Sequence, residues 1–211
     1  MKNLLIIGAR GFGREVYSHA LECAGYNSEY IIKGFLDDKA DALDGFNGYP
    51  PILCSVENYE IVQDDIFVCA LGSVAYKRLY TEMILERGGE FATLIHPSVL
   101  RNANVKIGKG VMVGKDVTLS NDTVIGDYVT IHGYAAVGHD AEIGSWCNVG
   151  AYCFMGGFSK LEEEVTLNVR STILPRITVR KGATVGAASL VLRNVKENTT
   201  VFGVPAQVLK F

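Results

Sequence analysis

The sequence lacks several features that mark whole classes of protein. It has no run of about twenty apolar residues, so we expect no membrane-spanning helix. It has no basic excess, because 20 Lys and Arg stand against 23 Asp and Glu for a net charge of -3, which argues against a nucleic-acid or membrane-surface partner. The apolar run at residues 4–7 is too short for a signal peptide. We therefore expect a cytoplasmic protein.

Cysteine is scarce and follows no pattern. The five cysteines form no C-x-x-C pair and no disulfide-like framework, so reduced thiols are expected. Cys147 and Cys153 occupy inward positions of the repeat described next, which makes them core residues rather than nucleophiles. A hydrophobic content of 48% is enough for a sizeable core, and 211 residues fit one large domain or two small ones.

The C-terminal half contains a long internal repeat. Every sixth residue from Ile107 to Val191 is aliphatic or Met, which makes fifteen matches without a break. A glycine often follows this residue, and a small or β-branched residue often stands two positions before it. A period of six fits neither an α-helix nor a heptad coil, but it fits short strands with a turn in every hexad.

Three hexads complete one coil of a narrow triangular prism. Side chains alternate along a strand, so the aliphatic residue and the small residue two before it point inward together. Five coils about 4.8 Å apart give a prism roughly 24 Å long. We expect the glycine after each aliphatic residue to permit the tight corner, because glycine adopts backbone conformations that other residues avoid.

This pattern resembles the left-handed parallel β-helix of the hexapeptide-repeat acyltransferases. The resemblance implies an all-β domain over residues 96–211. The left hand is taken from the resemblance, because the general crossover rule favours the right hand. The chain closes with VFGVPAQ at 201–207, which looks like the G-x-P-A element that follows the last coil in that family.

Residues 1–95 have a different organisation. Apolar strands are expected at 4–7, at 30–38 and at 66–73, and helical patterns follow the first and the third of them. This order predicts a small α/β domain, a Rossmann-like βαβαβ unit with a parallel sheet. Glycines after the first strand would let the backbone approach a phosphate at a helix N-terminus. A tight strand-to-helix turn without a ligand would explain the same glycines.

The segments GARGFGREV (8–16) and GFLDD (34–38) resemble the N-terminal domain of bacterial sugar acetyltransferases. These include the N-acetyltransferases of nucleotide-linked amino-dideoxy sugars and the sialic acid O-acetyltransferases. In the first branch this domain holds uridine diphosphate. The resemblance implies that the base and ribose face Asp37 and Asp38, and that the phosphates and sugar face Arg10, Gly11 and Phe12, with Gly8 and Gly13 completing the substrate-binding loop.

The segment VGHD at 137–140 resembles the I-G-H-D/E element of the same family, whose histidine is the general base. Imidazole has a pKa near 6.5 and can accept a proton near neutral pH. Asp140 would hold the ring of His139 in one tautomer. His139 lies just past a corner, so alternation along the strand leaves its direction open. A corner histidine bonded to backbone is the structural alternative.

The resemblance also implies acetyl-CoA as cosubstrate, no metal, and a homotrimer with active sites at subunit interfaces. Positions that match the acetyl-CoA groove of the family are His132, Asn148, Gly157, Val169 and Arg180.

The expected activity is acetyl-CoA-dependent acetylation of the amine of a nucleotide-linked amino-dideoxy sugar, by direct transfer. O-acetylation of sialic acid or another surface sugar is the alternative, and a non-enzymatic trimer that binds nucleotide sugars is a further one. A γ-class carbonic anhydrase has the same β-helix, but in that family two zinc histidines lie five residues apart, whereas His132 and His139 are seven apart. A sugar nucleotidyltransferase would need a larger N-terminal domain.

Overall fold

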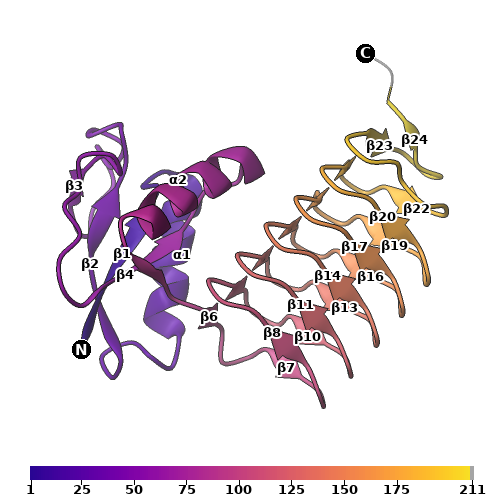
Figure 1. The fold of residues 1–211 in the computed structure, drawn as a ribbon, viewed down its shortest axis with the longest axis horizontal. Coiled ribbons are helices and arrows are strands. Elements are labelled where there is room, and N and C mark those ends of the chain that lie inside the picture. Colours follow the sequence, from indigo (N-terminus) through magenta and orange to yellow (C-terminus); the bar gives the residue numbers. More distant parts are fainter. Residues whose placement is uncertain (210–211) are drawn as a thin grey trace. The chain divides into compact units, whose positions relative to one another are not determined.

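The computed structural model describes residues 1–209 and divides the chain into two compact units, Met1–Leu94 and a second beginning at Ile95. The first unit contains a parallel sheet of five strands in the order β3-β2-β1-β4-β5 (Figure 1). Its elements are β1 (Lys2–Ile7), α1 (Gly11–Glu22), β2 (Tyr30–Leu36), β3 (Ile52–Cys54), β4 (Asp65–Cys69), α2 (Val74–Glu86) and β5 (Glu90–Phe91).

The predicted strands and helices of this unit are present, and two strands were missed. β3 and β5 have only three and two residues, too few to produce a periodic pattern. Strands β2 and β3 lie on one side of β1, and strands β4 and β5 lie on its other side. The strand order therefore changes direction between β1 and β4. In open parallel sheets, ligands bind at the carboxyl edge beside such a change of direction.

The central strand β1 is buried as a continuous run rather than in alternation. Leu4, Leu5, Ile6 and Ile7 have at most 1% of their surface exposed, as expected for a parallel strand covered on both faces. The chain then turns directly into α1. A Cβ at Gly13 would lie 1.9 Å from the carbonyl oxygen of Gly8, so only glycine allows the first turn of α1 to pack against the end of β1.

A buried ion pair ties the start of β4 to β2. Lys33 Nζ lies 3.0 Å from Asp65 Oδ1, and the Tyr59 hydroxyl donates to Asp65 Oδ2 at 2.7 Å. The Asp65 side chain is fully buried. Burial alone would raise the pKa of this carboxyl, but hydrogen bonds from Tyr59, the Val62 N–H and Lys33 outweigh burial and lower it. The ionised form of Asp65 therefore stabilises the folded state.

Replacing Asp65 with Asn should cost about 3 kcal/mol of stability at pH 7, because Lys33 is left without its buried partner. Since the pKa of Asp65 is lower in the folded than in the unfolded state, its contribution is present above about pH 4 and is lost as the pH falls through the folded value. Thermal melting across pH 2–8 would measure this. A difference from wild type that grows toward low pH would contradict it. Asp64→Asn, at the exposed neighbour, is the matched control.

The second unit is a parallel β-helix of two-residue strands with a short closing hairpin. The strands are β6 (Leu94–Ile95), β7 (Leu100–Arg101), β8 (Lys106–Ile107), β9 (Met112–Val113), β10 (Thr118–Leu119), β11 (Val124–Ile125), β12 (Thr130–Ile131), β13 (Ala136–Val137), β14 (Glu142–Ile143), β15 (Asn148–Val149), β16 (Phe154–Met155), β17 (Lys160–Leu161), β18 (Thr166–Leu167), β19 (Thr172–Ile173), β20 (Thr178–Val179), β21 (Thr184–Val185), β22 (Leu190–Val191), β23 (Thr200–Phe202) and β24 (Gln207–Val208).

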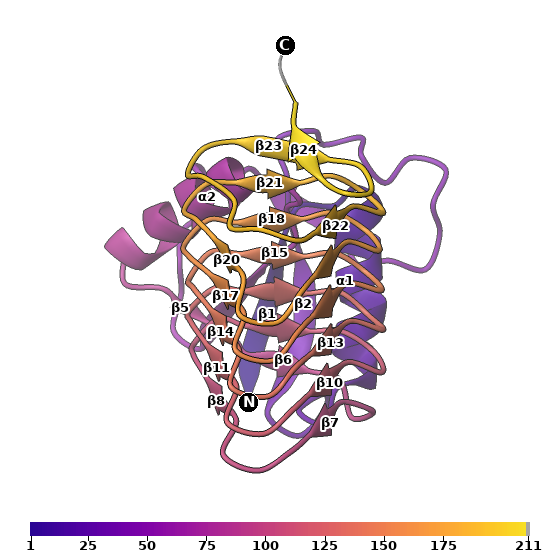
Figure 2. The same cartoon turned by 90° about the vertical axis from the view of Figure 1, so that its right-hand side faces the viewer.

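The strands form three faces of a prism. Face 1 runs from β7 to β22, face 2 from β8 to β20 and face 3 from β6 to β24. Each strand of the regular coils pairs in parallel with the strand one coil later, as where Val137 is opposite Met155. Figure 2 shows the strands of face 3 stacked as rungs. The predicted inward positions form one continuous core, which includes Cys147 and Cys153.

The prism begins earlier than the repeat pattern suggests. Strands β6 and β7 precede Ile107, the first residue of the predicted pattern. The position in phase with the repeat in β7 is Arg101, which is exposed and donates to the Val105 carbonyl at 2.6 Å. A charged residue is tolerated there because its side chain is exposed, and this charge interrupts the apolar pattern by which the repeat was recognised. At the other end, β24 pairs antiparallel with β23.

The predicted role of the repeat glycines is wrong. None of those that follow an aliphatic residue has a positive φ. They are needed for close approach instead, since a Cβ at Gly138 would lie 2.7 Å from the backbone N of Gly157 in the next coil. The left-handed residue is the second one after the glycine, such as Asp140 (φ 56°) or Tyr152 (φ 59°). Many of the corners are therefore made by aromatic, acidic or basic residues, and a few by Asn, Ala or Gly.

Replacing Gly150 with Ala should destabilise the β-helix by about 1–3 kcal/mol, because its Cβ would lie 2.8 Å from the backbone atoms Leu167 O and Val169 N. Chemical denaturation followed by circular dichroism measures the change. Gly72→Ala is the matched control, since a Cβ there meets nothing within 4 Å. Equal stability of the Gly150 and Gly72 variants would show that the coils can move apart without cost.

Candidate active site

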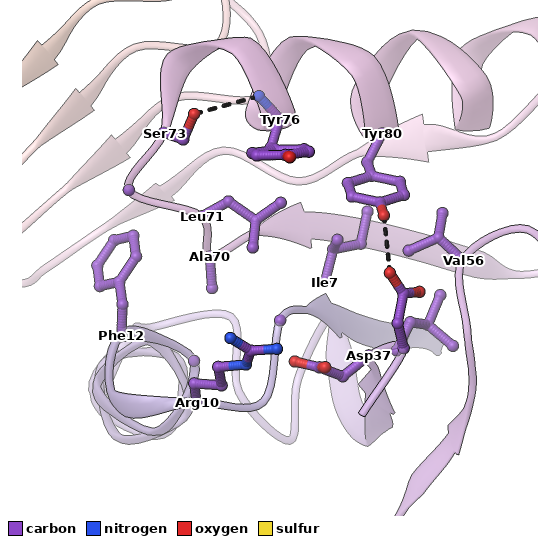
Figure 3. Close-up of a pocket in the computed structure, with 15 residues that line it drawn as sticks. Ile7, Arg10, Phe12, Asp37, Val56, Ala70, Leu71, Ser73, Tyr76 and Tyr80 are labelled. Carbon is purple, nitrogen blue, oxygen red and sulfur yellow. Dashed lines mark hydrogen bonds between the residues drawn. The ribbon is translucent and has the colours of Figure 1, made fainter. Parts of the chain in front are cut away.

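The carboxyl edge of the parallel sheet holds a pocket of about 480 Å³ (Figure 3). It lies where the strand order changes direction, beside the residues that follow β1, β2 and β4. Six of the seven predicted substrate-binding residues line it, and Gly11, at the first position of α1, does not. The six are Gly8, Arg10, Phe12, Gly13, Asp37 and Asp38.

One part of this pocket is built to attract an anion. Gly8 has a φ of 97°, and a Cβ there would lie 3.0 Å from the Ala70 carbonyl oxygen. Helix α1 begins next to it with Arg10 as N-cap, without a side-chain cap and without an acid in the first turn. The positive end of the helix dipole and the exposed Arg10 guanidinium therefore favour a negative group.

The two adjacent carboxylates of the pocket have different partners. Asp37 accepts hydrogen bonds from the backbone N–H of Ala9 at 2.8 Å and of Lys39 at 2.9 Å. Asp38 accepts one from the Tyr80 hydroxyl at 2.9 Å. Burial and this hydrogen bond raise the pKa of Tyr80 to about 12. Tyr80 is therefore protonated at neutral pH and remains the donor to Asp38.

Sequence reasoning missed the side of the pocket that α2 and the β3–β4 loop provide. Tyr76 and Tyr80 stack with ring centroids 6.5 Å apart and line the pocket together with Val56 and Leu71. Their spacing of four residues places both rings on one face of a helix. That spacing, in a helix that begins at a strand's carboxyl end, is the signal that could have revealed them.

His139 lies at the corner between β13 and β14 of the second unit, with its side chain outward and 59% exposed. Its Nδ1 is 2.8 Å from Asp140 Oδ2. An ionised carboxylate can only accept, so Nδ1 carries the proton and Nε2 keeps its lone pair when the ring is neutral. The pair therefore has the arrangement of a general base with an orienting acid.

The next coil fixes the position of the imidazole. A Cβ at Gly157 would lie 2.7 Å from His139 Nε2, so the ring occupies the space that any larger residue would fill. The Phe158 ring contacts the imidazole edge to face, with centroids 5.2 Å apart. Arg176, one coil further, places its guanidinium 4.6 Å from the Phe158 ring centroid. Three consecutive corners thus support one side chain.

The remaining predicted groove residues are distributed around the prism. Gly157 lies one coil after His139 on the same long edge of face 1, while His132 and Val169 lie on the other long edge of that face. Asn148 lies in β15 of face 3. Arg180 follows β20 on face 2, where its guanidinium is 3.8 Å from Glu162 Oε1. One copy of the chain therefore does not bring Arg180 to His139.

Two negative findings concern residues 1–209. No three His, Cys, Asp or Glu side chains there gather into a group that could hold a metal ion. No helix in that range has both the length and the apolar character needed to cross a membrane.

Comparisons with known proteins match both units. A model described as the PglD N-terminal domain matches residues 3–84, and one described as the GMPPB C-terminal domain matches residues 90–188. The UDP-N-acetylbacillosamine N-acetyltransferase of Bacillus subtilis is 27% identical over 114 residues, which are 52% of this chain and 50% of that protein. The chain thus spans about half the length of this curated relative.

Solved structures match nearly the whole chain. The acetyltransferase domain of PglB from Neisseria gonorrhoeae, in complex with acetyl coenzyme A, is 26% identical with a TM-score of 0.88 and 99% coverage of both chains. The chain is thus similar in sequence and fold to sugar acetyltransferases of the hexapeptide-repeat type. The second unit has the left-handed parallel β-helix of these structures, as the resemblance predicted. PerB from Caulobacter crescentus, in complex with CoA and GDP-perosamine, has the same fold at 23% identity, with a TM-score of 0.86, 100% coverage of this chain and 98% of that one.

His139 should be protonated on Nδ1 in its neutral form, because Asp140 accepts a hydrogen bond from that N–H. Replacing Asp140 with Asn should shift part of the population to the Nε2 tautomer. Long-range proton–nitrogen NMR of the imidazole distinguishes the two forms. Asp122→Asn, at the equivalent corner one coil earlier, should leave the His139 spectrum unchanged. A wild-type ring protonated on Nε2 would contradict the assigned hydrogen bond.

Proposed function

We propose that the chain is an acetyl-CoA-dependent N-acetyltransferase for the amine of a nucleotide-linked amino-dideoxy sugar. The observation that carries this proposal is the His139–Asp140 pair, in which Nδ1 faces the carboxylate and Nε2 is left as the basic nitrogen of a side chain that is 59% exposed. The anion-attracting pocket of the first unit supports a nucleotide-linked acceptor. The named activity of the Bacillus subtilis relative and the CoA and GDP-perosamine in the Caulobacter crescentus structure support the same class of reaction.

The chemistry follows from the orientation of the imidazole. Acetyl-CoA, when bound, supplies a thioester carbonyl as the electrophile. His139 Nε2 accepts the proton that the sugar amine loses as its nitrogen attacks that carbonyl. Asp140 keeps the ring oriented and stabilises the imidazolium, and this proton is then available to the departing thiolate. The acetyl group passes directly to the amine, so no nucleophilic residue of the chain is needed, in line with the buried positions of Cys147 and Cys153.

We also propose a homotrimer with the acetyl-CoA groove between neighbouring β-helices. The outward residues of face 1 support this, because none from β10 to β22 is charged and two large apolar residues of the face, Leu100 and Phe154, are exposed. Arg101, in the first strand of the face, is the exposed charge there. Face 2 instead has ion pairs between coils, such as Lys160 with Glu142 at 2.7 Å. A second copy packed against face 1 would lie along both long edges of that face. One edge contains His139 and Gly157, and the other contains His132 and Val169. Asn148 would reach such a groove only from face 3, and Arg180 only from face 2.

An amine on a nucleotide-linked sugar is favoured over a hydroxyl of sialic acid. The same general base serves both acceptors. A nucleotide-linked sugar has a diphosphate that suits the glycine-rich helix N-terminus and Arg10, whereas a free sugar acid has no such group. A binding protein without activity would need the pocket but not the His139–Asp140 pair. We place the reaction in the cytoplasm, where acetyl-CoA and nucleotide sugars are made.

The test is release of free thiol from acetyl-CoA with a panel of UDP- and GDP-linked amino sugars and free sialic acid. Turnover is expected with an amino sugar, and His139→Ala should reduce it by about 10²–10⁴-fold, the usual contribution of a general base. Asn121→Ala removes a side chain at the same corner one coil earlier and should leave turnover unchanged. Melting curves of both variants check that folding is preserved.

Other outcomes would contradict specific parts of the proposal. Turnover with sialic acid alone would favour O-acetylation. Full activity of folded His139→Ala would remove the general-base role. Binding of nucleotide without any thiol release or CoA binding would favour the non-enzymatic alternative.

A further inference from the structure

The two corners that follow His139 contain residues that adopt their backbone conformation at a cost. The earlier left-handed corners of this edge are formed by Asn or Asp, the non-glycine residues that adopt this conformation most readily. They are Asn104, Asp122 and Asp140. The next two are Phe158 (φ 58°) and Arg176 (φ 63°). A bulky side chain kept in a sparsely populated conformation points to a function that compensates for the strain.

Phe158 also differs from the aromatic corner residues of the other two long edges. Those residues stack on an aromatic residue of the next coil, in the pairs Tyr128–Trp146 and Tyr134–Tyr152. Phe158 contacts the His139 imidazole instead, at an interplanar angle of 88°. The Arg176 guanidinium lies over the Phe158 ring, whose negative face attracts a cation. The three side chains thus form a series of contacts across three successive coils.

The hydrogen bond to Asp140 is a weak restraint on the imidazole by itself. The side chains of His139 and Asp140 are 59% and 41% exposed, so water competes for the bond between them. The χ2 torsion of histidine has broad wells, and rotation about it would turn Nε2 away from the acceptor. Gly157 borders the ring on one side. Phe158 adds a second contact that opposes this rotation.

We propose that Phe158 and Arg176 are positioning residues for the general base. Phe158 keeps Nε2 of His139 directed at the acceptor, and Arg176 acts through Phe158 by holding its ring. This inference rests on the general-base role of His139 in the proposed function. It explains the left-handed Phe by catalysis, because a corner selected for stability alone would favour Asn, Asp or Gly.

Phe158→Asn should change stability and catalysis in different directions. Asn suits the left-handed corner, so the free energy of unfolding should stay unchanged or rise. The value of kcat should fall about two- to tenfold, because the ring contact that orients the imidazole is lost. KM for acetyl-CoA and for the sugar nucleotide should stay within about twofold. Phe158→Tyr keeps the ring and should restore kcat, and Tyr128→Leu, between faces 2 and 3, is the matched control with unchanged kcat.

Arg176 gives a second test that leaves the Phe158 corner intact. Arg176→Gln should lower kcat about two- to fivefold, because the cation over the ring is lost. Arg176→Lys keeps a cation and should restore most of the activity. If Arg176→Gln and Arg176→Lys fall equally, or if KM rises at constant kcat, the side chain does not act through the Phe158 ring and the proposal is wrong for Arg176.

NMR of the His139 imidazole tests the positioning role without any turnover. The Phe158 ring current should displace the His139 ring-proton signals, and Phe158→Asn should remove this displacement and broaden the Nδ1–H signal. Tyr128→Leu should leave both unchanged. A folded Phe158→Asn protein with wild-type kcat and unchanged imidazole signals would overturn the proposal, as would a raised KM with unchanged kcat, which indicates substrate contact. Wild-type protein without turnover would instead contradict the proposed function, and the imidazole signals would still show whether Phe158 orders the ring.

Discussion

The backbone hydrogen bonds between successive coils are the constraint on which the second unit depends. They place each residue next to the residue one coil later, as where the Phe158 N–H donates to the His139 carbonyl at 2.9 Å and the Arg176 N–H to the Gly157 carbonyl at 3.0 Å. This register decides which side chains meet at a corner. The contact of the His139 ring with Gly157 and Phe158 follows from it directly. The general base of the proposed reaction is therefore positioned by the ladder rather than by a specialised loop.

The period of six predicted the inward residues well, because burial acts on side chains two apart in a strand. It could not predict corner geometry, which depends on how closely two coils approach. Gly138 has no side chain because the backbone of Gly157 fills that space, whereas Asp140 takes the left-handed conformation itself. The sequence pattern had suggested instead that the glycines form the tight corners. Arg101 shows that the apolar pattern also fails at an end of the repeat. It stands at a position in phase with the aliphatic residues, but it is charged and exposed.

In the first unit, too, the sequence pattern predicted the local elements but not the side-chain contacts between distant residues. The glycines after β1 and the acids after β2 were found from the sequence, because strands and glycine-rich turns have local signals. The partners of those acids depend on residues far along the chain. Tyr80 stands 42 positions after Asp38, and nothing in the local sequence of either residue indicates the other. Adjacent acids in one motif can thus have unlike hydrogen-bond partners, which only tertiary contacts reveal.

The outward corner residues have a consequence for how this fold can change. Tyr134 stacks on Tyr152 with centroids 4.8 Å apart, and Tyr128 stacks on Trp146 at 4.4 Å. Each stack joins only neighbouring coils, so the unit is a linear array whose coupling is between nearest neighbours. A whole coil could be duplicated near either end without disturbing the contact between His139 and Gly157. An insertion of one or two hexads would move every later strand to a different face, so this architecture favours evolution in complete turns.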